Sequence, residues 1–330
     1  MCEAIGRYGW GYLPPTVNRL RGPLLDSEVS SFEEMRKKHE IKWSMEGCTL
    51  MSDGWTDQKG RSIINFLINS SAGSFYLYSI DASSHEKNVE FIASTLDDAM
   101  QKVGVQNVVQ ICTDNAANYV RAGKILMEKY SHLYWTPCVA HCIDLILEDI
   151  GRIPALKKVI VSGRQITSFI YGHSTLHSEF LQLTNNKELV RCGVTRFATS
   201  FLTLQSLKDN RYHLGKLDWQ KWLDIGNGEE VQRNVFARAF WAGVEDCLKA
   251  SQPLVALLRL VDADQTPCMG HVTQFFEKAS ATIESHFANK PAMLKTLKAI
   301  IKKRLQKHFD HDLFLAGAFL NPDFYYELKT

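Results

Sequence analysis

The chain has 330 residues, of which 45% are hydrophobic and 22% are charged. This composition is typical of globular proteins and excludes a disordered tail, a collagen-like rod and a low-complexity linker. The chain has 38 lysines and arginines and 36 aspartates and glutamates, so its net charge is +2. This overall charge does not indicate binding to nucleic acid, and any such argument has to come from local patches of charge. The length suggests about two domains.

Eight cysteines are scattered along the chain, and no apolar run approaches the ~18 residues that a membrane span requires. The N-terminal stretch MCEAIGRYGWGYLPP has no apolar segment of the kind that marks secretion. We therefore expect a protein with no membrane contact, in a reducing compartment, with its cysteines mostly free.

Short β-rich runs follow an N-terminal lead-in. Residues 1–44 are predicted to be irregular and helical, because prolines and glycines precede a charged, helix-like stretch. Strands are then predicted at 48–53, 61–69 and 74–80. The second has apolar residues at alternate positions, and the sequence SSAG joins it to the third as a hairpin.

Helices and strands alternate after this hairpin. Ser83 with Glu86 three residues on has the spacing of a capping box, and the helix that it predicts ends at Gly104. The remaining elements are a strand at 107–113, a helix at 120–130, a strand at 133–137 and a helix at 138–150. The order βββαβαβα is that of a ribonuclease-H-like fold, with a generic mixed α/β sandwich as the alternative.

The pattern becomes helical near residue 150. Residues 45–150 are therefore predicted as the ribonuclease-H-like core and residues 151–312 as an all-α insertion domain. Residues 313–330 are predicted to begin a C-terminal part of the core that is cut short.

Two carboxylates stand where predicted strands end. Asp53 closes the first strand and Asp114 follows the fourth. In open α/β sheets, sites form at the carboxyl ends of strands, and paired carboxylates there suit Mg²⁺ and phosphoryl transfer. The alternative is that each aspartate only caps the turn or helix that follows it.

Cys138, His141 and Cys142 form a C-x-x-H-C pattern. A zinc ion needs four nitrogen or sulfur ligands, and no second pair of such residues completes the set. A packed histidine with buried thiols is the favoured interpretation.

Basic residues suggest contact with nucleic acid at two places. Arg196 beside Phe197 has the chemistry to hold a phosphate and stack on a base, although a solvated arginine with a core phenylalanine is the simpler interpretation. Lys302, Lys303 and Arg304 belong to a basic amphipathic stretch with no acidic residue from 285 to 309. That stretch suits a polyanion or a solvated surface equally well.

Four strings, taken together, resemble the hAT superfamily of cut-and-paste DNA transposases, most closely its plant branch. They are SDGWTD at 52–57, VVQICTDNAANYVRAG at 108–123, WTPCVAHCIDLILEDI at 135–150 and TRFATSFLTLQSL at 195–207. The resemblance runs in order from about residue 5 to residue 325.

The resemblance implies a ribonuclease-H-like core interrupted by a large all-α insertion. It implies that Asp53 and Asp114 are the first two catalytic residues and hold Mg²⁺, and that Cys138 and His141 shape the core. The family's threonine-arginine-tryptophan motif, which holds the DNA end, matches Thr195 to Phe197, with phenylalanine in place of tryptophan. Stacking on a base would then be weaker, since the ring is smaller.

Two departures from the family shape the functional expectation. The family's third acid, a glutamate, and its C-terminal dimerisation region would follow the segment where this sequence ends, and the N-terminal zinc finger has no counterpart. We therefore expect a nuclear, transposase-derived, nucleic-acid-related protein that is catalytically incomplete, binds Mg²⁺ weakly or not at all, and does not form a homodimer. A domesticated interaction scaffold, or a decayed fragment with no settled role, is the alternative.

Overall fold

The computed structural model describes residues 6–191, 193, 197–262, 268–308 and 312–322. Two compact units make up the chain, residues 1–136 and residues 137–330, and each is described by itself. No helix in the described ranges is both long and apolar enough to cross a membrane.

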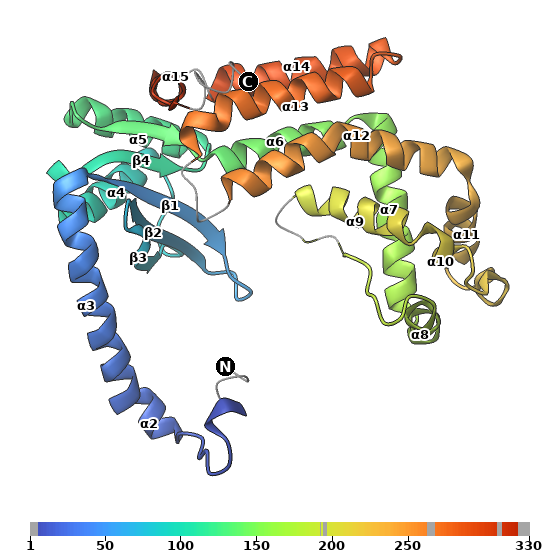
Figure 1. The fold of residues 1–330 in the computed structure, drawn as a ribbon, viewed down its shortest axis with the longest axis horizontal. Helices are drawn as coiled ribbons and strands as arrows, with labels where there is room; N and C mark the ends of the chain where they lie inside the picture. The colour runs from blue at the N-terminus through green and yellow to red at the C-terminus, as the bar shows by residue number, and fades with distance from the viewer. Residues whose placement is uncertain (1–5, 192, 194–196, 263–267, 309–311, 323–330) are drawn as a thin grey trace. The chain divides into compact units, whose positions relative to one another are not determined.

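Five strands form one mixed sheet in the first unit (Figure 1). The strands are β1 (Cys48–Thr56), β2 (Ser62–Ser70), β3 (Gly73–Asp81), β4 (Val108–Thr113) and β5 (Tyr134–Pro137). Their order across the sheet is β3-β2-β1-β4-β5, with β1 antiparallel to β2 and parallel to β4. An antiparallel hairpin pair continued by a parallel neighbour is the arrangement of a ribonuclease-H-like core, so the predicted α/β class is confirmed.

The core of the first unit lies where the strands meet helices α4 (Val89–Val103) and α5 (Ala117–Lys129). Side chains alternate along a strand, so Leu50 on β1 shares a face with its register partner Ile68 on β2. Both are 0% exposed, as is Met100 of α4. The opposite face of β1 carries the intervening residues, which are more exposed.

Two boundaries differ from the sequence prediction. Helix α4 is capped by Asn88, whose side chain accepts from Phe91 N at 2.8 Å, so the capping box at Ser83 is wrong. Ser83 Oγ instead accepts from the amide of Ser62 at 2.9 Å, at the start of β2. Strand β1 continues three residues beyond Asp53, because its end stays paired with β2.

A long helix, α3 (Pro23–Glu46), precedes the sheet and follows the short helix α2 (Val17–Arg21). It packs on the sheet through Trp43, which is 1% exposed, and Phe32, while its first turns extend away from the strands (Figure 1). Gly47 alone separates α3 from β1. Its φ is +79°, and a Cβ there would lie 3.0 Å from Val109, so only glycine fits without strain.

Every regular element described from Val139 onward is helical, as the fold prediction requires. The helices are α6 (Val139–Gly151), α7 (Pro154–Gly172), α8 (Ser174–Leu183), α9 (Ala198–Asp209), α10 (Arg211–Leu214), α11 (Gly228–Phe236), α12 (Arg238–Val261), α13 (Val272–His286), α14 (Pro291–His308) and α15 (Asp312–Phe319), with short 3₁₀ turns η1 (Val105–Asn107) in the first unit and η2 (Trp219–Trp222) and η3 (Met269–His271) in the second.

The compact units divide at residue 136 rather than at residue 150. Helix α6 accounts for the difference, because its buried residues Ile143, Ile146 and Leu147 belong to the core of the helical unit. The domain limits inferred from the sequence stay a prediction, since a compact unit and an evolutionary domain need not share a boundary.

Candidate metal and nucleic-acid site

The two candidate carboxylates lie on adjacent strands. Ser52 on β1 and Thr113 on β4 are partners in the parallel ladder. Asp53 and Asp114 each follow one residue later, so they stand side by side at the same end of the strand pair. Neighbouring strands lie about 4.8 Å apart, which is the separation that a shared ion needs.

Both aspartates also belong to the same side of the sheet. Met51 and Cys112, one position before the Ser52 and Thr113 pair, are register partners as well. Side chains two residues apart on a strand share a face, so Asp53 lies on the side of Met51 and Asp114 continues the side of Cys112. That side is opposite to the apolar core packed against α4.

Asp114 has a structural task besides any chemical one. Its Oδ1 accepts a hydrogen bond from the amide of Ala116 at 2.8 Å, directly before α5 begins at Ala117. This is the capping role that the sequence left open for it. Asp53 is exposed, inside the strand rather than at its end.

The charges of both carboxylates affect the pKa of a buried tyrosine. Tyr119, on the first turn of α5, is only 4% exposed. Burial first, and then the charges of Asp114 and, less strongly, Asp53, raise the pKa of its hydroxyl to about 12, whereas the Ser52 hydroxyl opposes the shift. The Tyr119 hydroxyl is therefore within electrostatic reach of both carboxylates. Tyr119 was not singled out from the sequence, although it closes the string CTDNAANY that contains Asp114.

A lysine lies at the same end of β1. A Cβ placed on Gly54 would lie 3.5 Å from the Tyr119 hydroxyl and 3.7 Å from Lys87 Nζ. Asn118 Nδ2 donates to the Lys87 carbonyl at 2.8 Å and so ties the lysine's loop to α5. Lys87 was not predicted as a site residue from the sequence. The one feature that could have indicated it is its isolation, since no other lysine or arginine occurs between Arg61 and residue 102.

The donor set fits Mg²⁺ better than zinc. Two carboxylates on one face are the hard oxygen ligands that Mg²⁺ takes, usually together with substrate phosphates. In the described part of the chain, no group of three or more histidine, cysteine, aspartate or glutamate side chains is gathered for one ion.

The C-x-x-H-C residues are spread over different environments. Cys138 is the N-cap position of α6, Cys142 is buried in the helix, and His141 is exposed to solvent. Burial of Cys142 fits the interpretation of packed thiols at a strand-to-helix junction.

Only part of the predicted DNA-end motif can be placed, because Arg196 lies outside the described residues. Phe197 directly precedes α9, and the Asp144 carboxylate accepts from the amides of Phe197 at 3.4 Å and Ala198 at 3.1 Å. The Phe197 ring packs on Gly151 so closely that a Cβ there would lie 2.1 Å from it. In this structure the ring therefore belongs to the helical core, the simpler of the two interpretations from sequence.

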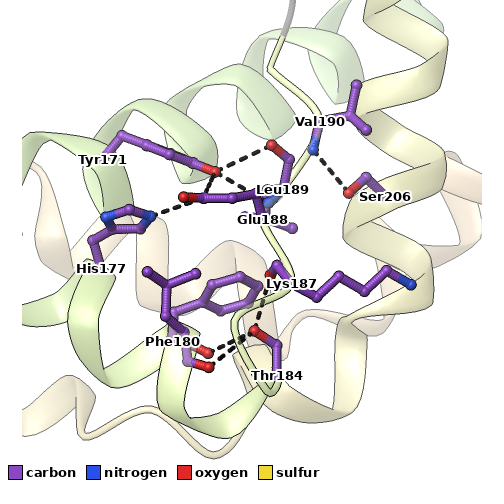
Figure 2. Close-up of polar contacts among 10 residues, drawn as sticks. Tyr171, His177, Phe180, Thr184, Lys187, Glu188, Leu189, Val190 and Ser206 are labelled. Atoms are coloured by element: carbon purple, nitrogen blue, oxygen red, sulfur yellow. Dashed lines mark hydrogen bonds and ion pairs between the residues drawn. The ribbon is translucent and has the colours of Figure 1, made fainter. Parts of the chain in front are cut away.

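A polar clamp holds the segment that leads toward this motif (Figure 2). The Tyr171 hydroxyl on α7 bonds to the Glu188 carboxylate and accepts from Leu189 N at 3.1 Å. His177 Nε2 lies 2.9 Å from the same Glu188 carboxylate. Val190 N donates to Ser206 Oγ at 3.0 Å, which ties the segment to α9.

The basic residues predicted to contact DNA differ in their surroundings. Lys302 and Lys303 of α14 are exposed. Arg304 instead donates to the Asp149 carboxylate of α6 at 2.8 Å, with both side chains about one fifth exposed. This hydrogen bond raises the pKa of Arg304. The positive charge of Arg304 is therefore paired with a carboxylate inside the helical unit.

A family model matches part of the chain. The family described as "Domain of unknown function (DUF659)" matches residues 15–166, a range that contains both Asp53 and Asp114. DUF659 is a family found in hAT-type transposase-like plant proteins. No curated protein matches the chain. The first unit and helix α6 are thus similar to a segment of transposase-like proteins.

Proposed function

We propose that this chain is a transposase-derived protein of the nucleus that binds nucleic acid and keeps a divalent-cation site beside the inner strands β1 and β4. The observation that carries the proposal is the placement of Asp53 and Asp114 directly after the Ser52 and Thr113 register pair. The DUF659 match over the same residues supports it.

The chemistry of this site follows from the residues that form it. Asp53 and Asp114 would hold Mg²⁺, which when bound activates a water or 3′-hydroxyl and stabilises the leaving oxygen of a phosphodiester. The charges of both aspartates act on the hydroxyl of Tyr119, and Lys87 Nζ lies with that hydroxyl beside Gly54. Two carboxylates balance half of the four positive charges of a two-metal site, so we expect weak binding of Mg²⁺ without nucleic acid and no complete transposition by this chain.

Nucleic-acid contact would be electrostatic and tolerant of sequence. Lys302 and Lys303 are exposed cations on a helix with no acidic residue. Such lysines contact phosphates rather than base edges, so affinity falls as the salt concentration rises, because releasing counterions into more concentrated salt is less favourable.

A non-enzymatic interaction scaffold is the second candidate, and specific contacts favour it. Asp114 caps the turn that precedes α5, and the Phe197 ring fills the space above Gly151. Both residues therefore have structural tasks that would preserve them after the chemistry was lost.

Metal binding separates the two candidates. Titration of the purified chain with Mn²⁺, followed by electron paramagnetic resonance, should detect a site that Asp53→Asn and Asp114→Asn each weaken by about tenfold or more. Asp98→Asn, which removes an exposed carboxylate on α4, is the matched control and should change nothing. Equal Mn²⁺ affinity in the wild type and both site variants would leave the scaffold as the function. Specific Mn²⁺-dependent nicking of DNA would show instead that the enzyme is complete.

A further inference from the structure

A groove of about 400 Å³ runs between α13 and α14, which lie side by side in the helical unit (Figure 1). Its floor is apolar, since Ile283 is 1% and Ile301 5% exposed, and Leu305 continues this lining. Lys298 and Lys302 form its rim on the α14 side. The groove therefore offers an apolar strip beside positive charge.

The charge at this rim is largely unbalanced. Lys298 pairs with Glu284 at 2.8 Å, but both side chains are about half exposed, and such surface pairs contribute little. Lys302 makes no ion pair with any residue that the structure describes. From residue 285 to 309 the sequence contains no aspartate or glutamate. An occupant of the groove should thus be apolar and acidic.

The N-terminal half of α3, residues 23–35, has this chemistry and is called here the acidic half of α3. It contains Asp26, Glu28, Glu33 and Glu34 and no lysine or arginine. Leu25 and Val29, one helical turn apart, are each 52% exposed. Among its apolar side chains only Phe32 reaches the sheet, where it stacks on Phe75 at 4.6 Å.

The dimensions of the two surfaces also agree. The exposed side chains of Leu25 and Val29 lie four residue steps apart, or about 6 Å of helix, which fits within the groove wall from Lys298 to Leu305, about 10 Å long. Amphipathic helices commonly bind by laying such a stripe into an apolar groove between two helices.

We propose that the acidic half of α3 of one molecule docks into the groove between α13 and α14 of a second copy of this chain. Leu25 and Val29 enter the apolar strip, and the acidic side chains meet Lys298 and Lys302. One contact explains two surfaces that are otherwise exposed. The interface joins different patches on the two copies, so it builds rings or open chains rather than a two-fold dimer.

Nucleic acid is the competing occupant of the groove's rim. A phosphate backbone would use the lysines but would leave the apolar floor uncovered, because phosphates require cations and not Ile283 or Ile301. The peptide-like occupant accounts for both the floor and the rim.

Sedimentation velocity of the full chain tests this interface. We expect association that increases with protein concentration and decreases with salt, since opposite charges meet. Leu25→Asp with Val29→Asp, the helix variant, and Lys298→Glu with Lys302→Glu, the groove variant, should each weaken association by about tenfold or more.

A mixing experiment makes the test specific. The groove variant keeps an intact α3 and the helix variant keeps an intact groove, so a mixture should form a 1:1 dimer that grows no further. Ile41→Asp and Lys303→Glu are the matched controls, one on the other end of α3 and one beside the groove, and both should associate like the wild type. Equal thermal melting of all variants would show that they fold.

Three results would overturn the interface: a wild type that stays monomeric at every concentration, variants that associate as the wild type does, and a mixture that forms no dimer. The proposal is independent of the metal site, because Asp53→Asn should leave self-association unchanged. Loss of DNA binding in the groove variant with unchanged self-association would assign the rim to nucleic acid instead.

Discussion

Ser52 on β1 is the parallel register partner of Thr113 on β4, and this pairing fixes the relation between the two candidate carboxylates. A slip of one residue would turn Asp53 toward the opposite face of the sheet, because side chains alternate along a strand. The register is defined by burial on one side only, where Leu50 and Ile111 are both 0% exposed.

Asp114 should show two separable roles. Asp114→Asn keeps an oxygen that can accept from Ala116 N, so its stability should stay close to that of the wild type while Mn²⁺ binding falls. Asp114→Ala loses the cap as well and should lower the free energy of unfolding by ~1 kcal/mol. Urea unfolding of both variants measures this difference, and equal stabilities would show that the cap contributes nothing.

Gly151 should be intolerant of a methyl group. A Cβ there would lie 2.1 Å from the Phe197 ring, so Gly151→Ala forces the ring to move and should destabilise the protein by ~1–3 kcal/mol. Gly172→Ala at the end of α7 meets nothing within 4 Å and serves as the control, with unchanged or slightly higher stability. Thermal melting of the pair gives the comparison, which fails if both variants melt alike.

The basic residues of α14 should divide into two classes. Lys302→Ala and Lys303→Ala should weaken binding to any DNA and make it less dependent on salt, by about one counterion for each lysine. Arg304→Ala should leave this salt dependence unchanged but lower stability by ~1–3 kcal/mol, because Asp149 loses the closer of its two ion-pair partners, the other being Arg152 at 3.6 Å. Fluorescence anisotropy across a salt series, with urea unfolding beside it, distinguishes the classes.

Alkaline pH should act on the clamp around Tyr171. Burial and the Glu188 charge raise the pKa of its hydroxyl to about 12 in the folded protein, against 10 for the free group. The folded state therefore holds this proton more tightly, and the associated stability is complete below pH 10 and is lost as pH rises toward 12. Tyr171→Phe should lose less stability than the wild type across this interval in urea titrations. Parallel losses would mean that the hydroxyl is not held as the structure shows.

Cys247 should be inert in the folded protein. It is 0% exposed, and burial raises the pKa of its thiol to about 12, so little thiolate forms near neutral pH. Iodoacetamide at pH 8 should modify it only in denaturant, as read by peptide mass spectrometry. Rapid labelling of the native chain would contradict the burial of α12.

The sequence was informative wherever local pattern decides structure. Alternating apolar residues located β2, and the order of strands and helices predicted the sheet. Capping depends on which polar side chain the tertiary structure leaves available. The Ser83 hydroxyl accepts from the amide at the start of β2, and Asn88 caps α4 instead. The length of β1 depended on its pairing with β2, which spacing alone does not reveal.

The candidate site was predicted in outline and missed in detail. Asp53 and Asp114 follow from the rule that sites form at strand ends. The burial of Tyr119 beside them and the approach of Lys87 depend on how α5 and its preceding loop fold over the sheet. The Arg304 and Asp149 contact joins residues 155 positions apart, so a basic run in the sequence could not show that one of its charges is used internally.

Gly47 is the only residue between helix α3 and strand β1, which carries Asp53. The helix has 24 residues, or about 36 Å, and a single glycine with a constrained backbone joins it to β1. A force on the far end of α3 therefore acts with a long lever arm on the single residue that joins the helix to β1. Because Phe32 and Trp43 of α3 pack against Phe75 of β3, such a force reaches β3 through these ring contacts as well as β1 through Gly47.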